Sequence, residues 1–219
     1  MKNLVRNYFT SLPWGMRLFL LIFVFGFPVA WLGRHTGLFD LYSWFALIPA
    51  LVWKGQVWRL VTSDFLPTGP LDWGISLFWL ATLVSVLGRN WSSRAFWGYC
   101  LLGALAGSLF IVLLEPKSTG GVVGGGAMIF ALLVAWDWMY RHERLLLLGI
   151  GEISVRQAAI LIAIINSLIL FFGCAGWFMM LSVWCGGLAG WLWLAVRTKW
   201  LMGKTPQQTR SERVSRLEL

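Results

Sequence analysis

A few side chains of this sequence could in principle carry out hydrolysis. Ser108 and Ser182 lie in apolar runs, where a serine becomes a nucleophile only if a base lies within hydrogen-bond reach. The two histidines, His35 and His142, lie in separate connections outside those runs. A serine on a membrane helix usually bonds a carbonyl of its own turn. We therefore keep a displaced serine hydrolase site only as an alternative.

Two aspartates raise a second possibility, because aspartyl intramembrane proteases need two carboxylates that face each other. Asp72 follows Gly69 and Pro70, which is typical of an N-cap at the start of a helix. Asp137 lies well inside another apolar run, toward the opposite membrane face, so we do not expect the two to meet. Asp137 is expected to pair with Arg141 at i+4, although a client-binding or proton-linked role stays open.

Other side chains that could bind a metal or a ligand are sparse. Asn166 lies in the middle of the fifth apolar run, where an amide more often makes an interhelical hydrogen bond. The three cysteines, Cys100, Cys174 and Cys185, lie in apolar segments and are predicted to be small buried side chains. Neither they nor the histidines have the spacing of metal ligands. The sequence therefore predicts no metal site and no cofactor.

The composition indicates which elements must hold these side chains. Of the 219 residues, 58% are apolar and 12% are charged, and the mean hydropathy is +0.73. These values are typical of a multi-pass membrane protein, in which each span needs about 20 mostly apolar residues. Six runs meet this requirement: 16–33, 71–89, 94–115, 125–141, 155–174 and 177–197. Most connections between them are short, which predicts one compact helical bundle.

The net charge of +9 is distributed as the positive-inside rule predicts. If the N-terminus lies inside, only four basic residues lie outside: Arg34, Lys54, Arg59 and Lys117. We therefore expect both termini in the cytoplasm. The compact size and the lack of organelle signals favour an integral multi-pass protein of the bacterial-type inner or plasma membrane. No basic domain is left to bind nucleic acid. Residues 1–200 are predicted to form the membrane domain, and residues 201–219 a basic cytoplasmic tail.

The long connection between the first two runs, residues 35–70, is too apolar for a solvated loop and too interrupted for a span. It mixes Trp44, Trp53 and Trp58 with charged residues. Such amphipathic segments fit the headgroup boundary, where indole rings are half hydrated. We expect this connection to lie along the membrane surface.

Glycines gather in three segments. TGGVVGGGAMIFALL, residues 119–133, places five glycines before an apolar run. GALAG, residues 103–107, and GGLAG, residues 186–190, each place two glycines four apart on one helix face. Small residues at this spacing let helix backbones approach closely in lipid.

Four features, in order along the chain, resemble the rhomboid superfamily of intramembrane serine proteases. GQVWRLVTSDFL, residues 55–66, is similar to the Trp-Arg signature of the family's first loop, and the second span closes with LGR, residues 87–89. GGGAMIF, residues 124–130, and VWCGGLAG, residues 183–190, occupy the places of Gly-x-Ser-Gly and His-x-x-Gly-x-x-x-Gly. The resemblance implies an all-α membrane protein, a six-transmembrane-helix rhomboid-like bundle with a membrane-surface first loop.

The same resemblance implies that the catalytic chemistry has been lost. Gly126 stands where the serine should be, and Val183 stands where the histidine should be. The family's His-x-x-x-Asn, which helps to hold the oxyanion, falls on Asp72 and Ser76, and a carboxylate there would repel developing negative charge. We therefore expect no proteolytic activity.

The structural part of the motifs is retained. The resemblance marks Trp58 and Arg59 as an anchor of the first loop, with Arg59 bonding backbone carbonyls of that loop. Gly124, Gly125 and Gly126 are expected to form a turn that needs positive φ. Gly186 and Gly190 are expected to pack closely against that turn.

The resemblance to pseudoproteases and to the derlin branch implies a binding function. The expected partners are the lipid bilayer and transmembrane helices of client proteins, bound for sorting, retention or quality control beside the second and fifth spans. One alternative is an active rhomboid-family serine endopeptidase with a displaced site, and another is a small transporter or lipid-perturbing protein. The transporter lacks support, because paired midplane charges and matching interrupted helices are missing from the sequence.

Overall fold

The computed structural model describes residues 12–88, 90–141, 143–147, 151–172 and 176–202. Six long helices account for most of it: α2 (Trp14–Thr36), α6 (Pro70–Leu87), α7 (Ser93–Leu114), α8 (Gly126–Tyr140), α9 (Val155–Phe172) and α10 (Gly176–Met202). They follow the six apolar runs of the sequence. The predicted tail, residues 201–219, lies outside the described residues from 203 onward, as does Cys174.

Four of these helices, α2, α6, α7 and α10, are long and apolar enough to cross a membrane. Helix α8 has 15 residues, which at 1.5 Å per residue gives roughly 22 Å, less than the roughly 30 Å of a bilayer core. The described apolar part of α9 is also short, Val155–Ile169. The prediction of a mostly helical, multi-pass membrane protein is confirmed, whereas the number of six spans stays a prediction.

Local sequence signals set the helix boundaries. Ser92 caps α7, its hydroxyl oxygen accepting a hydrogen bond from the Ala95 N–H at 3.3 Å. Pro70 is the first residue of α6, where a missing N–H costs nothing. Helix α2 ends at Gly37, which adopts the left-handed conformation with φ 71°.

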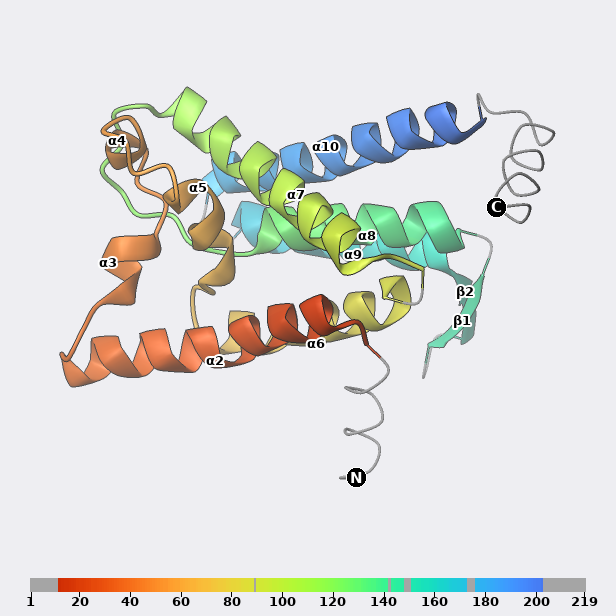
Figure 1. Cartoon of the computed structure of the whole chain (residues 1–219), viewed down its shortest axis with the longest axis horizontal. Coiled ribbons are helices and arrows are strands. Elements are labelled where there is room, and N and C mark those ends of the chain that lie inside the picture. The colour runs from red at the N-terminus through yellow and green to blue at the C-terminus, as the bar shows by residue number, and fades with distance from the viewer. Residues whose placement is uncertain (1–11, 89, 142, 148–150, 173–175, 203–219) are drawn as a thin grey trace, which may run out of the picture.

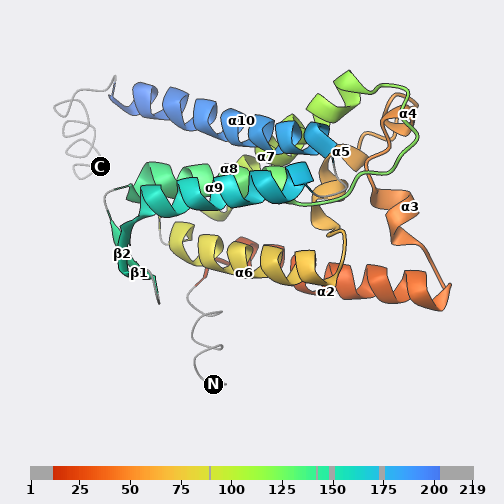
Figure 2. The ribbon, with the colours of Figure 1, turned by 180° about the vertical axis from the view of Figure 1, so that it is seen from behind.

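The long helices run side by side along the longest axis of the molecule (Figure 1). Helix α8 lies in the centre and packs against α6, α7, α9 and α10, while α2 packs against α6 and α7. Seen from behind, α6 and α9 lie on the same face of the bundle (Figure 2). The buried core joins Phe19 and Phe23 of α2, Leu80 and Leu83 of α6, and Phe96 of α7.

The connection between α2 and α6 folds into four short helices at one end of the bundle (Figure 1): α3 (Leu41–Phe45), α4 (Pro49–Val52), α5 (Arg59–Thr62) and the 3₁₀ turn η1 (Ser63–Phe65). Trp44 and Trp53 are exposed there, as expected for a segment at a membrane surface. Phe65 instead packs into the bundle, with its ring 5.6 Å from that of Phe19.

The opposite end of the bundle carries a small antiparallel hairpin of β1 (Arg144–Leu147) and β2 (Gly151–Ser154), with Arg144 opposite Ser154. The expectation of an all-α chain is wrong for this segment. Its leucine run is too short for periodicity to distinguish a strand from a loop or a helical turn. The hairpin leads directly into α9, because β2 ends at Ser154 and α9 begins at Val155. The Val155 N–H donates to the Glu143 carbonyl at 3.0 Å.

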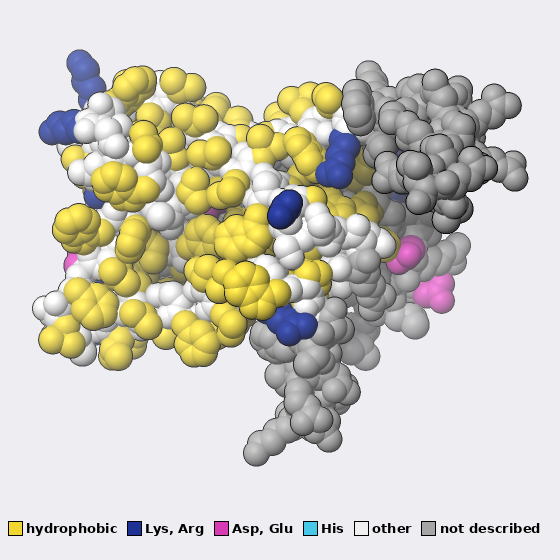
Figure 3. All heavy atoms as spheres, in the orientation of Figure 1, with side chains coloured by type: hydrophobic (Ala, Val, Ile, Leu, Met, Phe, Trp, Pro, Cys, Tyr) yellow, Lys and Arg dark blue, Asp and Glu magenta, His cyan; other side chains and the backbone are white. Residues whose placement is uncertain are grey.

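The surface carries different kinds of side chain in different places along the helix axes. Apolar side chains cover much of the described face in Figure 3, and Lys and Arg side chains lie at one end of it and beside the residues drawn in grey. In Figure 1, α2 begins and α10 ends on the side of the bundle away from the first connection. An apolar band of this kind, flanked by charge, is the surface that a bilayer requires.

Candidate functional site

A cavity of about 440 Å³ opens at the end of the bundle that carries the first connection. Its walls come from α6, α7, α8, α9, α10, η1 and the segment before α8. Six residues singled out from the sequence line it: Asp72, Ser76, Gly124, Gly125, Gly126 and Val183. Ser108, Ser182 and Asn166 line it as well. Residues far apart in the chain therefore meet at one place.

Gly126 and Val183 face each other at this cavity. A Cβ added to Gly126 would lie 2.8 Å from Cγ2 of Val183, well inside van der Waals contact. Gly126 is the first residue of α8, and Val183 lies on α10. The structure thus brings together the two positions at which the resemblance to proteases expects a nucleophile and a base, and fills them with a hydrogen atom and a methyl group.

The turn before α8 depends on two glycines. Gly124 has φ 136°, a backbone conformation that side chains with a Cβ rarely adopt. A Cβ on Gly125 would lie 2.6 Å from the Asp64 carbonyl oxygen. The Gly124 N–H donates to the Ser63 carbonyl at 3.2 Å, so η1 supports the turn from one side.

Helix α10 packs against α8 through its own glycines. A Cβ on Gly186 would lie 2.6 Å from the Ala127 carbonyl oxygen. Gly190 approaches the Tyr99 hydroxyl, and a Cβ there would lie 3.2 Å from Cβ of Ala131. Gly186 and Gly190 therefore pack against Ala127 and Ala131 in the first turns of α8. Val183, not these glycines, packs against Gly126.

The first connection is held by Arg59, whose side chain is only 3% exposed. Its guanidinium donates to the Ala46 carbonyl at 2.6 Å, the Ser43 carbonyl at 2.8 Å and the Gln56 side-chain oxygen at 2.7 Å. The neighbouring Trp58 is partly exposed and donates from its indole to the Trp44 carbonyl at 3.4 Å. Burial lowers the pKa of Arg59, but a guanidinium stays charged.

This network reaches the glycine turn through one pair of backbone bonds. Leu47, next to Ala46, exchanges two hydrogen bonds of 2.8 Å with Val122. Val122 lies two residues before Gly124. The buried arginine therefore fixes a strand-like contact that positions the segment leading into α8.

Asp72 and Ser76 form a small polar group at the start of α6. The Asp72 carboxylate accepts from the Thr68 N–H at 2.8 Å, from the Thr68 hydroxyl at 3.0 Å and from the Ser76 hydroxyl at 3.3 Å. Gly69, not Asp72, is the N-cap, so the expectation for Asp72 is wrong by three residues. Asp72, the third residue of α6, instead bonds back to Thr68, one residue beyond the N-cap N–H that a capping box uses.

Two other polar residues of the apolar runs lie apart from each other. Asp137 pairs with Arg141 at 3.8 Å, lies on α8 and does not line the cavity. Asn166 is exposed on α9. Within the described part of the chain, its side chain makes no hydrogen bond, so the expected interhelical bond is not formed there.

The serines of the cavity lack a base. The Ser182 hydroxyl donates to the Met179 carbonyl at 2.9 Å, within its own turn. Ser108 is 3% exposed, and its hydroxyl has no hydrogen-bond partner among the described residues. Among the described residues that line the cavity, none is histidine or lysine. His35 lies at the end of α2, with its ring 4.3 Å from that of Trp31.

Asp64 is a cavity residue that the sequence reasoning does not single out. It is 5% exposed, and its carboxylate accepts the Met128 N–H at 3.2 Å. Gly125, the N-cap of α8, has no side chain for this role, so Asp64 supplies the cap from η1. Burial raises the pKa of Asp64 to about 7. The signal in the sequence is a single acid in TSDFLP, residues 62–67, directly before Phe65 and Leu66.

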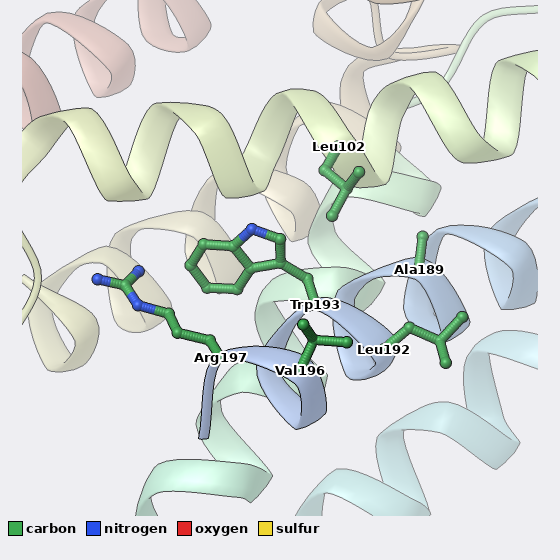
Figure 4. A pocket seen from close by; sticks show the side chains of 6 residues that line it. All are labelled: Leu102, Ala189, Leu192, Trp193, Val196 and Arg197. Atoms are coloured by element: carbon green, nitrogen blue, oxygen red, sulfur yellow. The ribbon is translucent and has the colours of Figure 1, made fainter. Parts of the chain in front are cut away.

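A second hollow, of about 560 Å³, lies between α7 and α10 (Figure 4). Leu102 of α7 faces Ala189 and Trp193 of α10, and the Arg197 guanidinium lies 4.8 Å from the Trp193 ring centre. Its lining is apolar except for Arg197. It offers no nucleophile or acid, and the described residues hold no group of three His, Cys, Asp or Glu that could bind a metal.

Comparison with known proteins places the chain in one family. No curated protein matches it significantly. Residues 16–196, which include every long helix but the ends of α2 and α10, match a family of integral membrane proteins. The chain therefore belongs to the family described as Eukaryotic integral membrane protein (DUF1751).

Proposed function

We propose that this protein is a rhomboid-like membrane protein that has lost proteolytic activity and binds transmembrane helices of other proteins. The proposal includes six spans, with α8 and α9 crossing the bilayer in a locally thinned region. It also includes cytoplasmic termini and a plasma or inner membrane location. Basic residues near the starts of α2 and α7 and near the ends of α8 and α10 support that orientation: Arg17, Arg94, Arg141 and Arg197.

The observation that carries the proposal is the contact between Gly126 and Val183. A serine protease needs an alkoxide and a base within hydrogen-bond reach. Here a glycine and a valine occupy the two facing positions, 2.8 Å from a would-be Cβ to a methyl carbon. Because the turn, the glycine packing and the buried arginine are all present around this pair, the scaffold supports binding without hydrolysis.

The walls of the cavity support lateral access from the bilayer. Leu71 and Ile75 of α6 and Ile169 of α9 line the cavity and are also 84%, 58% and 63% exposed. Helix α6 packs on α2 and α8, and α9 packs on α8 and α10, so these exposed side chains border the space between them. An apolar helix could exchange lipid contacts for contacts with this border and with the polar groups behind it.

Site-specific photocrosslinking tests the binding function. A photoreactive amino acid replaces Ile75, which lines the cavity, or Phe25, which is 62% exposed on α2 and does not line it. We expect synthetic transmembrane helices to crosslink from position 75 in proteoliposomes and much less from position 25. Equal crosslinking from both positions would show that the helices collide with the protein without binding at the cavity.

The alternative of an active serine endopeptidase rests on Ser108 and Ser182, whose hydroxyls line the same cavity. A fluorophosphonate probe distinguishes the two functions, because it labels only an activated serine. We expect no labelling of the native chain. Labelling that disappears with Ser108→Ala or Ser182→Ala would favour the peptidase.

A further inference from the structure

The cavity is acidic inside a basic protein. Asp64 and Asp72 line it, and among the described residues of its wall there is no Lys, Arg or His. The whole chain carries a net charge of +9. The cavity is thus a place where a cation meets an uncompensated carboxylate, whereas most of the charged surface would repel it.

The carboxylates of Asp64 and Asp72 differ in the number of hydrogen bonds that they accept. Asp72 accepts three hydrogen bonds, from the Thr68 N–H, the Thr68 hydroxyl and the Ser76 hydroxyl. Asp64 is only 5% exposed, and within the described part of the chain its carboxylate accepts only the Met128 N–H. One carboxylate oxygen of Asp64 therefore has no donor among the described residues and is left open to the cavity.

Ser108 adds a second unpartnered group. Ser108 is 3% exposed and lines the same cavity, and its hydroxyl makes no hydrogen bond among the described residues. Asn166 presents its amide from α9, on the exposed side. A buried acceptor, a hydroxyl and an amide around one space are suited to a ligand group with several N–H donors.

We propose that the cavity binds a lysine or arginine side chain carried by a transmembrane helix of a client, with the Asp64 carboxylate as its counter-charge. This inference rests on the client-binding function proposed above. A basic side chain is expensive within a bilayer and gains a partner here. The exposed leucine and isoleucines between α6 and α9 would contact the apolar remainder of the same helix.

Other cations fit the cavity less well. A metal ion needs more ligands than one free carboxylate, and the described residues contain no group of three potential ligand side chains. A lipid ammonium headgroup carries a phosphate, which would lie beside Asp64 and Asp72 without a basic partner in the described wall. A side chain on an apolar helix brings the positive charge alone.

The test compares two helices and three forms of the protein in phosphatidylcholine vesicles. The helices are identical except for one lysine or one norleucine in the half facing the cavity. The proteins are the full native chain, Asp64→Asn and Glu115→Gln. Asparagine can still accept the Met128 N–H, and Glu115 is an exposed acid at the same end of the bundle that does not line the cavity.

We expect the lysine helix to bind the native chain and Glu115→Gln on the order of tenfold more tightly than the norleucine helix, a factor worth about 1.4 kcal/mol. Asp64→Asn should abolish that preference. Equal binding of both helices to the native chain would overturn the charge-recognition proposal but leave client binding intact. Binding of neither helix would overturn both.

A zero-length carbodiimide reaction on the native chain keeps the test valid if Asp64→Asn fails to fold. It joins the lysine amine to a carboxyl group in contact with it, and mass spectrometry maps the product. An amide at Asp64 supports the proposal, and an amide only at another acid overturns it. Loss of lysine-helix binding when phosphatidylethanolamine is added would also overturn it, by making a lipid amine the occupant.

Discussion

Two connected regions of the molecule differ in their chemistry. One is the buried arginine of the first connection, and the other is the contact between glycine and valine at the start of α8. Arg59 is buried and donates three hydrogen bonds within the first connection. Gly126 and Val183 have no polar side-chain atom, and they meet where a reactive pair would have to lie. The comparison teaches that costly polar contacts can shape the surroundings of a site whose centre is formed by a glycine and a valine.

The first prediction concerns the buried arginine of this comparison. Arg59→Met removes three donors, which leaves the buried Ala46 carbonyl without this partner and the Ser43 carbonyl, in an exposed residue, without its bond to the guanidinium. We expect the free energy of unfolding to fall by about 3 kcal/mol. Thermal unfolding in detergent measures it, with Lys54→Met, an exposed cation of the same connection, as the control. Equal stability of the two variants would show that Arg59 does not anchor the connection.

The second prediction concerns the packing that carries the site. A side chain at Gly186 would strike the Ala127 backbone, with its Cβ 2.6 Å from the carbonyl oxygen. We expect Gly186→Val to destabilise the protein by about 2 kcal/mol through overpacking. Gly98→Val on α7, where an added Cβ meets nothing within 4 Å, is the matched control. Similar losses of melting temperature in both variants would mean that helix propensity, not close contact, sets the effect.

The third prediction uses the raised pKa of Asp64. The carboxyl has a pKa of about 7 in the folded chain, against 3.8 for an unperturbed aspartate, so the folded state binds more protons between these values. Stability therefore falls as pH rises from 3.8 to 7 and is constant above. Asp72 on α6 and Cys100 on α7 are the titratable groups near Asp64 on neighbouring helices.

The measurement is the difference in melting temperature between the native chain and Asp64→Asn at pH 5 and pH 8, in which the other titrating groups largely cancel. Between pH 5 and pH 8, we expect the free energy of unfolding of the native chain to fall by at least about 1.4 kcal/mol relative to that of the variant, which corresponds to one pKa unit. A difference that does not change with pH would mean that Asp64 is ionised throughout.

The fourth prediction tests whether Gly126 and Val183 touch. Gly126→Ala adds a Cβ 2.8 Å from a Val183 methyl group, and Val183→Ala removes that methyl group. We expect Gly126→Ala to be destabilising alone and less so in the Val183→Ala background, with a coupling energy of about 1 kcal/mol. Strict additivity of the two changes would place the residues out of contact.

Much of the architecture can be predicted from the sequence, because apolar runs bracketed by charge define helices in a membrane protein. The bounds of α7 and α8 differ from the predicted runs by one residue at each end. The hairpin before α9 escapes prediction, since a leucine run of that length has no decisive periodicity. Which helices pair through Ala127 and Ala131 depends on three-dimensional packing, and glycine spacing indicates only that some close contact exists.

The site, like the fold, can be predicted from the sequence only in part. Gly126 and Val183 are identified by their places in motifs, and they meet in space. The role of Asp64 cannot be predicted, because an acid in a loop becomes a cap for a distant helix only when the chain brings η1 to Met128. The sequence places Asp72 at the right helix end but at the wrong capping position, since Pro70 fixes the start of α6 and makes Gly69 the cap.

The central claim is that this scaffold binds helices without cleaving them, and its most direct test is a cleavage assay in proteoliposomes. The native chain, Ser108→Ala and Ser182→Ala are each incubated with a synthetic transmembrane substrate, beside an active intramembrane protease as the positive control. We predict no cleavage by any of the three forms while the substrate still crosslinks from position 75. Cleavage by the native chain that is lost in one of the serine variants would contradict the claim.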